Sequence, residues 1–338
     1  MRNNATTLFS ATAALIVVCG ATPSAAQHAD ILVQAVDDRL VTGAADFDLG
    51  AWTLDQRVFS GSFTSDFFTT NPGWNALGSG SPALPAGAAA LPPKTELHWD
   101  FLPIKIDGVA QPLAYWDGAG GVAFGAMPTA DYRFEIQGFD GFYYSTGEAG
   151  EVAAGAAIAK TGDLGGIHDH QILFVDDYDG LLQTNPADGI YLVAVRLKMI
   201  DLDRARPLFL VMETSGAPAG ARDAAAAWVE AQVDLLAPDF AADFDGDLSV
   251  DGDDLAAWQT GYGGAVARQV AGDATYDNDV NGADFLAWQR GRGASIDSFA
   301  GVSTTAASAA PIPEPASILL LLAALGVRAI AVARRDRS

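Results

Sequence analysis

Acidic side chains recur at matched spacing in two short segments near the end of the chain. Residues 243–254 read DFDGDLSVDGDD, and residues 273–284 read DATYDNDVNGAD, 30 positions further on. Calcium takes six to eight oxygen ligands, and a 12-residue loop supplies them from positions 1, 3, 5, 7, 9 and 12. Without a cation, so many carboxylates would repel one another. The spacing therefore predicts two calcium-binding loops, with two solvated acidic turns as the alternative.

Both loops can fill the six ligand positions, but not equally well. The position-6 residue needs a left-handed backbone, which Asn278 tolerates and Leu248 adopts less easily. An Asp at position 12 reaches less far than the usual Glu, so we expect modest affinity, suited to millimolar extracellular calcium. The expected ligands are Asp243, Asp245, Asp247, the Ser249 carbonyl, Asp251 and Asp254 in the first loop, and Asp273, Thr275, Asp277, the Asp279 carbonyl, Asn281 and Asp284 in the second.

The repeat continues past each loop into a segment that we expect to be helical. Residues 255–259 read LAAWQ and residues 285–289 read FLAWQ. Two copies at one period are unlikely to arise by chance. Trp258 and Trp288 each follow a predicted ligand by four residues, which puts them on the same helix face. We therefore expect them to form the core of a small module rather than a ligand platform.

Taken together, residues 240–293 resemble a type I dockerin, a duplicated module of EF-hand-type calcium loops and helices. The resemblance implies binding to a cohesin-like module and association with polysaccharide-degrading enzymes. The departures lie on the partner surface, where Trp258 and Trp288 replace the usual Leu, and Gly252-Asp253 and Gly282-Ala283 replace small hydroxyl residues. The resemblance supports calcium more strongly than it supports a cohesin partner.

A second candidate metal site consists of two histidines. His168 and His170 flank Asp169, and on a strand residues i and i+2 share a face. They could therefore share a transition metal. Gly162, five further residues and then His-x-His resemble the opening of a cupin motif, but Phe174 and Val175 stand where the cupin Glu would be. A polar edge strand is the alternative, and a cupin-like metalloprotein is our third functional hypothesis.

The segment before the repeats alternates apolar runs with turn residues and predicts a β-sandwich or jelly roll. Residues 190–200 are expected to form a half-buried strand, with Arg196 and Lys198 on the polar face. We expect strands at 30–36, 51–59, 96–106, 109–116, 132–138, 169–175, 189–200 and 207–214. The predicted domains are a signal peptide (1–26), the β-sandwich (27–218), a linker helix (219–239), the calcium module (240–293), a flexible linker (294–312) and a sorting segment (313–338).

The two ends of the chain predict export. Residues 1–26 combine Arg2, an apolar run and the small residues Ser24-Ala25-Ala26, as in a secretory signal. Residues 311–338 resemble the PEP-CTERM sorting signal, with Pro313-Glu314-Pro315, an apolar stretch and a basic end. The resemblance implies a transient transmembrane helix, processing by an exosortase, and delivery to the cell surface, outer membrane or extracellular matrix.

Composition limits the possible functions. The net charge of −23 argues against nucleic acid, which requires stripes of Lys and Arg. Motifs of serine hydrolases, zinc proteases and nucleotide-binding loops do not occur in the sequence. We therefore expect a non-enzymatic calcium-binding protein of the surface or matrix, whose β-sandwich recognises glycan or protein and whose repeat is a dockerin-like assembly module. A secreted carbohydrate-active enzyme carrying a dockerin is the alternative.

Overall fold

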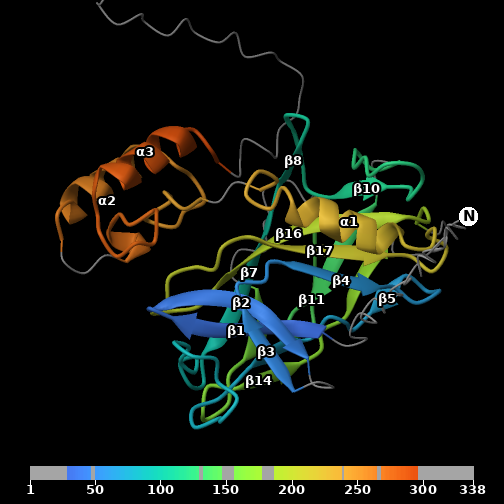
Figure 1. Cartoon of the computed structure of the whole chain (residues 1–338), viewed down its shortest axis with the longest axis horizontal. Helices are drawn as coiled ribbons and strands as arrows, with labels where there is room; N and C mark the ends of the chain where they lie inside the picture. The colour runs from blue at the N-terminus through green and yellow to red at the C-terminus, as the bar shows by residue number, and fades with distance from the viewer. Residues whose placement is uncertain are drawn as a thin grey trace, which may run out of the picture. The chain divides into compact units, whose positions relative to one another are not determined.

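The computed structural model describes residues 29–46, 50–128, 132–146, 156–176, 186–237, 240–264 and 268–295. All of these belong to the first of two units into which the chain divides, Met1–Gly301. They form a mainly β structure with several sheets, to which three α-helices are added (Figure 1). This confirms the predicted fold class. The predicted signal peptide and C-terminal sorting segment lie outside the described residues.

The first sheet has five strands in the order β14 (Ile167–Asp169), β6 (Trp74–Ala76), β1 (Ala29–Val36), β2 (Arg39–Asp46) and β3 (Ala51–Leu54). Its centre is the antiparallel β1–β2 pair, in which Leu32 lies opposite Gly43. A Cβ atom at Gly43 would lie 1.8 Å from the Thr53 carbonyl oxygen of β3. Glycine at this position lets β3 approach β2 closely. Strand β2 is not among the strands expected from the sequence pattern.

The second sheet runs β13 (Ala157–Lys160), β7 (Glu96–Leu102), β16 (Ile190–Lys198), β17 (Leu208–Glu213) and β4 (Val58–Ser62), and β10 (Ala114–Trp116) also pairs with β16. Strands β17 and β4 are parallel, and the other pairs are antiparallel. A third sheet has the order β12 (Tyr143–Ser145), β11 (Arg133–Gln137), β15 (Leu173–Asp176) and β5 (Phe68–Thr69). Strands β8 (Ile104–Ile106) and β9 (Val109–Gln111) form a separate hairpin.

Several predicted strands are shorter than expected because a turn residue divides them. Pro103 separates β7 from β8, and Pro112 separates β9 from β10; proline has no N–H to donate to a ladder. Asp55, with a φ of 65°, lies between β3 and β4. The long predicted segments at 51–59, 96–106 and 109–116 are therefore each two strands.

Strand β16 is buried on both faces, which corrects the half-buried strand that we expected. Val193 and Val195 belong to a core shared with the first and third sheets, whereas Leu192 belongs to a second core on the other face. Arg196 lies in this strand and is only 1% exposed. The alternating pattern of the sequence could not show that a second layer covers the polar face.

The second layer consists of the helices and the tandem repeat. Helix α1 (Ala221–Glu230) packs on β4 and β17 through Ala221, Ala225 and Val229 (Figure 1). Helices α2 (Gly252–Gly261) and α3 (Gly282–Gly291) follow the two acidic loops and contact each other. The second core joins residues of β16 and α1 to Phe244, Val250 and Trp288 of the repeats. The repeats are thus packed against the β structure through a common core.

Candidate metal centre

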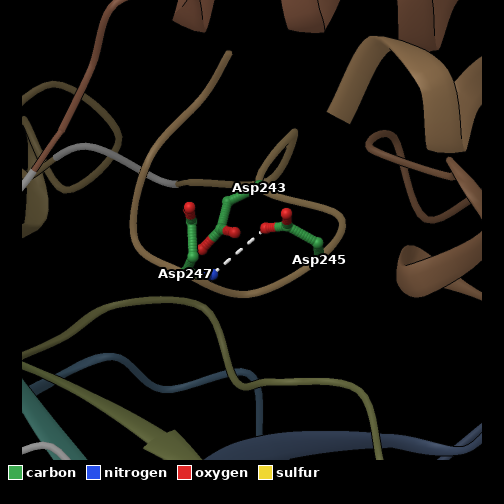
Figure 2. A group of neighbouring side chains, drawn as sticks. All are labelled: Asp243, Asp245 and Asp247. Carbon is green, nitrogen blue, oxygen red and sulfur yellow. Dashed lines mark hydrogen bonds between the residues drawn. The ribbon is translucent and has the colours of Figure 1, made fainter. Parts of the chain in front are cut away.

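The first acidic loop brings three carboxylates together. One carboxylate oxygen from each of Asp243, Asp245 and Asp247 lies within 4.8 Å of the others (Figure 2). Asp243 is buried, whereas Asp245 and Asp247 are exposed. Within the part of the chain that the structure describes, this is the only cluster of three or more acidic, histidine or cysteine side chains with such spacing. Hard carboxylate oxygens at this spacing suit a calcium ion.

Hydrogen bonds from the backbone hold this loop in shape. Asp243 accepts from the Gly246 amide through Oδ1 (2.7 Å) and from the Leu248 amide through Oδ2 (3.2 Å). Asp245 accepts from the Asp247 amide at 3.2 Å (Figure 2). Leu248 adopts the left-handed backbone required at position 6, with a φ of 67°, although its side chain disfavours it. The loop is therefore ordered by its own position-1 carboxylate.

The predicted ligands at positions 9 and 12 begin the following helix. Asp251 caps α2 by accepting from the Asp253 amide at 2.9 Å. Asp254 accepts from the Phe244 amide through Oδ1 (2.6 Å) and from the Asp251 amide through Oδ2 (2.7 Å). The structure does not bring these two carboxylates into the cluster of three. They close the loop and form a capping box at the helix start.

The second loop repeats these contacts at matching positions. Asp273 accepts from the Asn278 amide at 2.9 Å, and Asn278 has the same φ of 67° as Leu248. Asp284 accepts from the Asn281 amide at 2.7 Å and from the Thr275 hydroxyl at 2.9 Å. The Thr275 hydroxyl thus donates to the position-12 carboxylate. Asp277 and Asp279 are exposed, but the described residues hold no second cluster of three carboxylates.

The two tryptophans of the repeats connect the loops reciprocally. The indole N–H of Trp258 donates to the Asn281 carbonyl at 3.0 Å, and the indole N–H of Trp288 donates to the Asp251 carbonyl at 2.7 Å. Each tryptophan therefore reaches position 9 of the opposite loop. Trp288 is 6% exposed and belongs to the second core. Both side chains are structural, as expected from their spacing.

Two arginines from the β structure face the first loop, although neither is close to it in sequence. Oδ2 of Asp243 lies 3.5 Å from Nη2 of Arg196 and 3.4 Å from Nη1 of Arg204. Gly246 has a φ of 88°, a left-handed backbone that favours glycine, and the Arg204 guanidinium lies over it, where a Cβ atom would come within 1.4 Å. The only sequence signal was an arginine in the middle of an apolar strand.

Burial sets the electrostatics of the loops. It raises the pKa of Asp243 above its usual value, although Arg196 and Arg204 act to lower it. Burial likewise raises the pKa values of Asp254 and Asp273. The ionised form of each carboxylate is therefore less favourable than in water. A bound divalent cation would supply the compensating charge.

The structure brings the two predicted histidine ligands side by side, but among the described residues they belong to no cluster of three metal-binding side chains. The rings of His168 and His170 have centroids 5.3 Å apart. Nδ1 of His168 lies 2.6 Å from Oδ1 of Asn75, and Nδ1 of His170 lies 2.9 Å from the Thr70 carbonyl. Nε2 of His170 is 3.7 Å from Oδ2 of buried Asp30. The transition-metal site and the cupin-like hypothesis stay predictions.

Comparison with known proteins identifies one segment. Residues 311–338 match the family described as the PEP-CTERM protein-sorting motif. No curated protein and no solved structure matches the chain. The comparisons do not support the dockerin resemblance of residues 240–293, which stays a prediction. Among the described residues, no helix is long and apolar enough to cross a membrane.

The matched motif indicates how the protein is sorted. A PEP-CTERM motif implies an exported protein that is anchored transiently in the membrane, processed by an exosortase and sorted to the cell surface. The predicted export route and the predicted exosortase partner therefore agree with the match.

Proposed function

We propose that this exported chain is a non-enzymatic surface or matrix protein whose tandem repeat binds calcium and whose β structure recognises a glycan or protein. The observation that carries the calcium proposal is the cluster of Asp243, Asp245 and Asp247, with carboxylate oxygens within 4.8 Å of one another. The first loop is the stronger site of the two. The second is weaker because Thr275 stands where the first loop has Asp245.

Calcium would act as a structural ion in this arrangement. The loops lie directly before α2 and α3, and their residues Phe244 and Val250 are part of the core shared with β16. An ion that binds only the folded loops stabilises the folded state by mass action, by about 2.7 kcal/mol at a concentration 100 times its dissociation constant. Millimolar calcium outside the cell suits loops of modest affinity.

The test is a calorimetric titration of the full chain with calcium chloride. We expect two sites, and the exposed carboxylates at position 5 allow each to be removed separately. Asp247→Asn should abolish the first site and leave the second, and Asp277→Asn should do the reverse. Asp253→Asn removes an equal charge from an exposed, non-ligand position of α2 and should leave both sites. Absence of binding at several millimolar calcium would refute the proposal.

A secreted carbohydrate-active enzyme carrying a dockerin remains the alternative function, and a cohesin-like module remains a proposed partner of the repeats. Incubation of the full chain with a polysaccharide panel distinguishes the enzyme from a non-enzymatic glycan-binding protein. Retention of a polysaccharide without release of reducing sugar supports a binding protein, whereas release of reducing sugar supports the enzyme. The calcium titration is independent of this result.

A further inference from the structure

The third sheet carries most of the exposed aromatic side chains of the protein. In the part of the chain that the structure describes, five Phe or Tyr side chains are at least 40% exposed, and only Tyr262 lies outside this sheet. Phe68 belongs to β5 and Tyr143 to β12. Phe139 and Phe142 lie in the turn that joins β11 to β12. Exposed apolar side chains gathered in one place mark an interaction surface.

Alternation along β11 and β12 divides this sheet into a core face and an outer face. Phe134 and Ile136 of β11 are fully buried in the core, and Tyr144 of β12 packs against it. Successive side chains of a strand point to opposite faces. Glu135 and Tyr143 therefore lie on the outer face, and neither core cluster of the described residues includes them.

Aromatic and polar side chains alternate across the outer face. The register places Tyr143 opposite Gln137, and Glu135 opposite Phe174 of β15. Phe68 follows on the next strand, opposite Phe174. The rings of Tyr143 and Phe174 meet across β11, with centroids 5.1 Å apart and planes at 80°. Aromatic rings thus lie directly beside side chains that can form hydrogen bonds.

Hydrogen bonds hold the aromatic turn in place. Oδ1 of Asp140 accepts from the Phe142 amide at 3.0 Å, and Oδ2 of Asp140 accepts from the Tyr144 hydroxyl at 2.6 Å. The Phe139 amide donates to the Ala157 carbonyl of β13 at 2.7 Å. A surface that is ordered before binding loses less conformational entropy when a ligand is bound.

The charges of the outer face narrow the chemistry of the ligand. Arg133 lies opposite Asp176, and Glu135 shares their face, so the strands carry one basic and two acidic side chains there. Such a face, on a chain with a net charge of −23, would repel an anionic polymer. Charged residues are depleted at the centre of protein interfaces, whereas Glu135 lies in the central part of this face. These features favour an uncharged ligand rich in hydroxyl groups.

We propose that the outer face of the third sheet binds a neutral polysaccharide. The inference deepens the recognition role proposed for the β structure and rests on it, but it does not depend on calcium. The apolar C–H face of a sugar ring packs on an aromatic side chain, and its uncharged hydroxyl groups form hydrogen bonds with Gln137 and Asp176. Phe68, Phe174 and Tyr143 come from three strands, so they can contact successive sugar units of an extended chain.

The experiment is a depletion isotherm of the full chain on beads coated with xyloglucan, galactomannan or dextran, in buffer containing a calcium chelator. Beads coated with polygalacturonate serve as the charged control. We expect binding to at least one of the neutral polysaccharides and none to polygalacturonate. The double variant Phe68→Ala, Tyr143→Ala should bind roughly tenfold more weakly or worse. Tyr262→Ala removes a ring that is 60% exposed outside this sheet and should leave the affinity unchanged.

Each ring is also replaced singly, and circular dichroism checks the fold, so the assignment does not depend on one variant. Failure of the native chain to bind any of the three neutral polysaccharides would refute the inference. Binding to polygalacturonate alone would refute it and still support glycan recognition. Equal affinities of the native chain and the ring variants would place the glycan site elsewhere in the protein. Self-association of the native chain that is lost in the ring variants would reassign the face to a second copy.

Discussion

The guanidinium of Arg196 lies 3.5 Å from the carboxylate of Asp243, and the two side chains are 1% and 0% exposed. The first belongs to the central strand β16 and the second is position 1 of the first acidic loop. Arg196 also lies 4.0 Å from Asp100 and over the ring of Phe240. This buried charge contact links the loop to the β structure, and it explains why an arginine occurs within an apolar strand.

The contact predicts that the two position-1 carboxylates differ in their effect on stability. Asp243→Asn leaves the buried Arg196 without its nearest carboxylate, so we expect a loss of about 3–5 kcal/mol in the free energy of unfolding. Asp273→Asn is the matched variant, because Asp273 accepts from backbone amides of its own loop, and should cost about 1 kcal/mol. Urea unfolding of the full chain with a calcium chelator measures both. Equal losses would contradict a structural role for the Arg196–Asp243 pair.

Arg204 should weaken calcium binding at the first loop. Its guanidinium is 3.4 Å from the Asp243 carboxylate, with 20% of the side chain exposed, and a nearby cation opposes a second one. Arg204→Gln should therefore raise calcium affinity at this loop several-fold, about 1 kcal/mol. Arg206→Gln removes a charge that pairs with Asp234 instead and serves as the control. Calorimetry checks this, and unchanged or weaker binding in Arg204→Gln would count against the predicted ligand role of Asp243.

The reciprocal tryptophan contacts predict cooperation between the two loops. Trp288→Phe removes the N–H that donates to the Asp251 carbonyl, leaving a part-buried acceptor unpaired at a cost of about 1–3 kcal/mol. We expect calcium to bind the two loops cooperatively in the native chain and less so in this variant. Trp228→Phe changes a tryptophan of α1 that packs on Phe124, and should leave cooperativity intact. Identical binding curves for the native chain and Trp288→Phe would refute the coupling.

The raised pKa values of three tyrosines predict that the folded state loses stability at alkaline pH. Burial raises the pKa values of Tyr115 and Tyr191 above 10.0, and a hydrogen bond to Asp140 raises that of Tyr144. A folded-state pKa above the unfolded value favours the protonated folded form. The resulting stability is complete below pH 10 and is lost as the pH rises through the raised values, at about 1.4 kcal/mol per unit of pKa difference.

The measurement is the free energy of unfolding as a function of pH, followed by circular dichroism alongside phenolate absorbance. We expect the phenolate absorbance of the buried Tyr191 to rise together with unfolding. Tyr191→Phe should flatten the loss of stability above pH 10, whereas Tyr262→Phe, at a side chain that is 60% exposed, should not. Full phenolate formation in a chain that is still folded would refute the prediction.

Local patterns in the sequence were sufficient for several features of this protein. The order of Pro313-Glu314-Pro315, apolar stretch and basic end indicated the sorting motif that residues 311–338 match. Contacts between residues close in sequence form the repeated loops and their helix starts. Contacts between equivalent positions of the two copies orient the tryptophans. The strand pattern gave the mainly β class, although β2 was missed because Gly43 and its alanines lack a strong β signal.

The tertiary structure alone decided which distant residues meet. Nothing in the spacing of Arg196, Arg204 and Asp243 indicates that they converge. Strand β16 looked half-buried because alternation reports only the local pattern, whereas α1 and the repeats cover its second face. Hydrogen bonds within a loop depend on local sequence, but burial and charge pairing depend on which surfaces pack together, and that is determined by the whole chain.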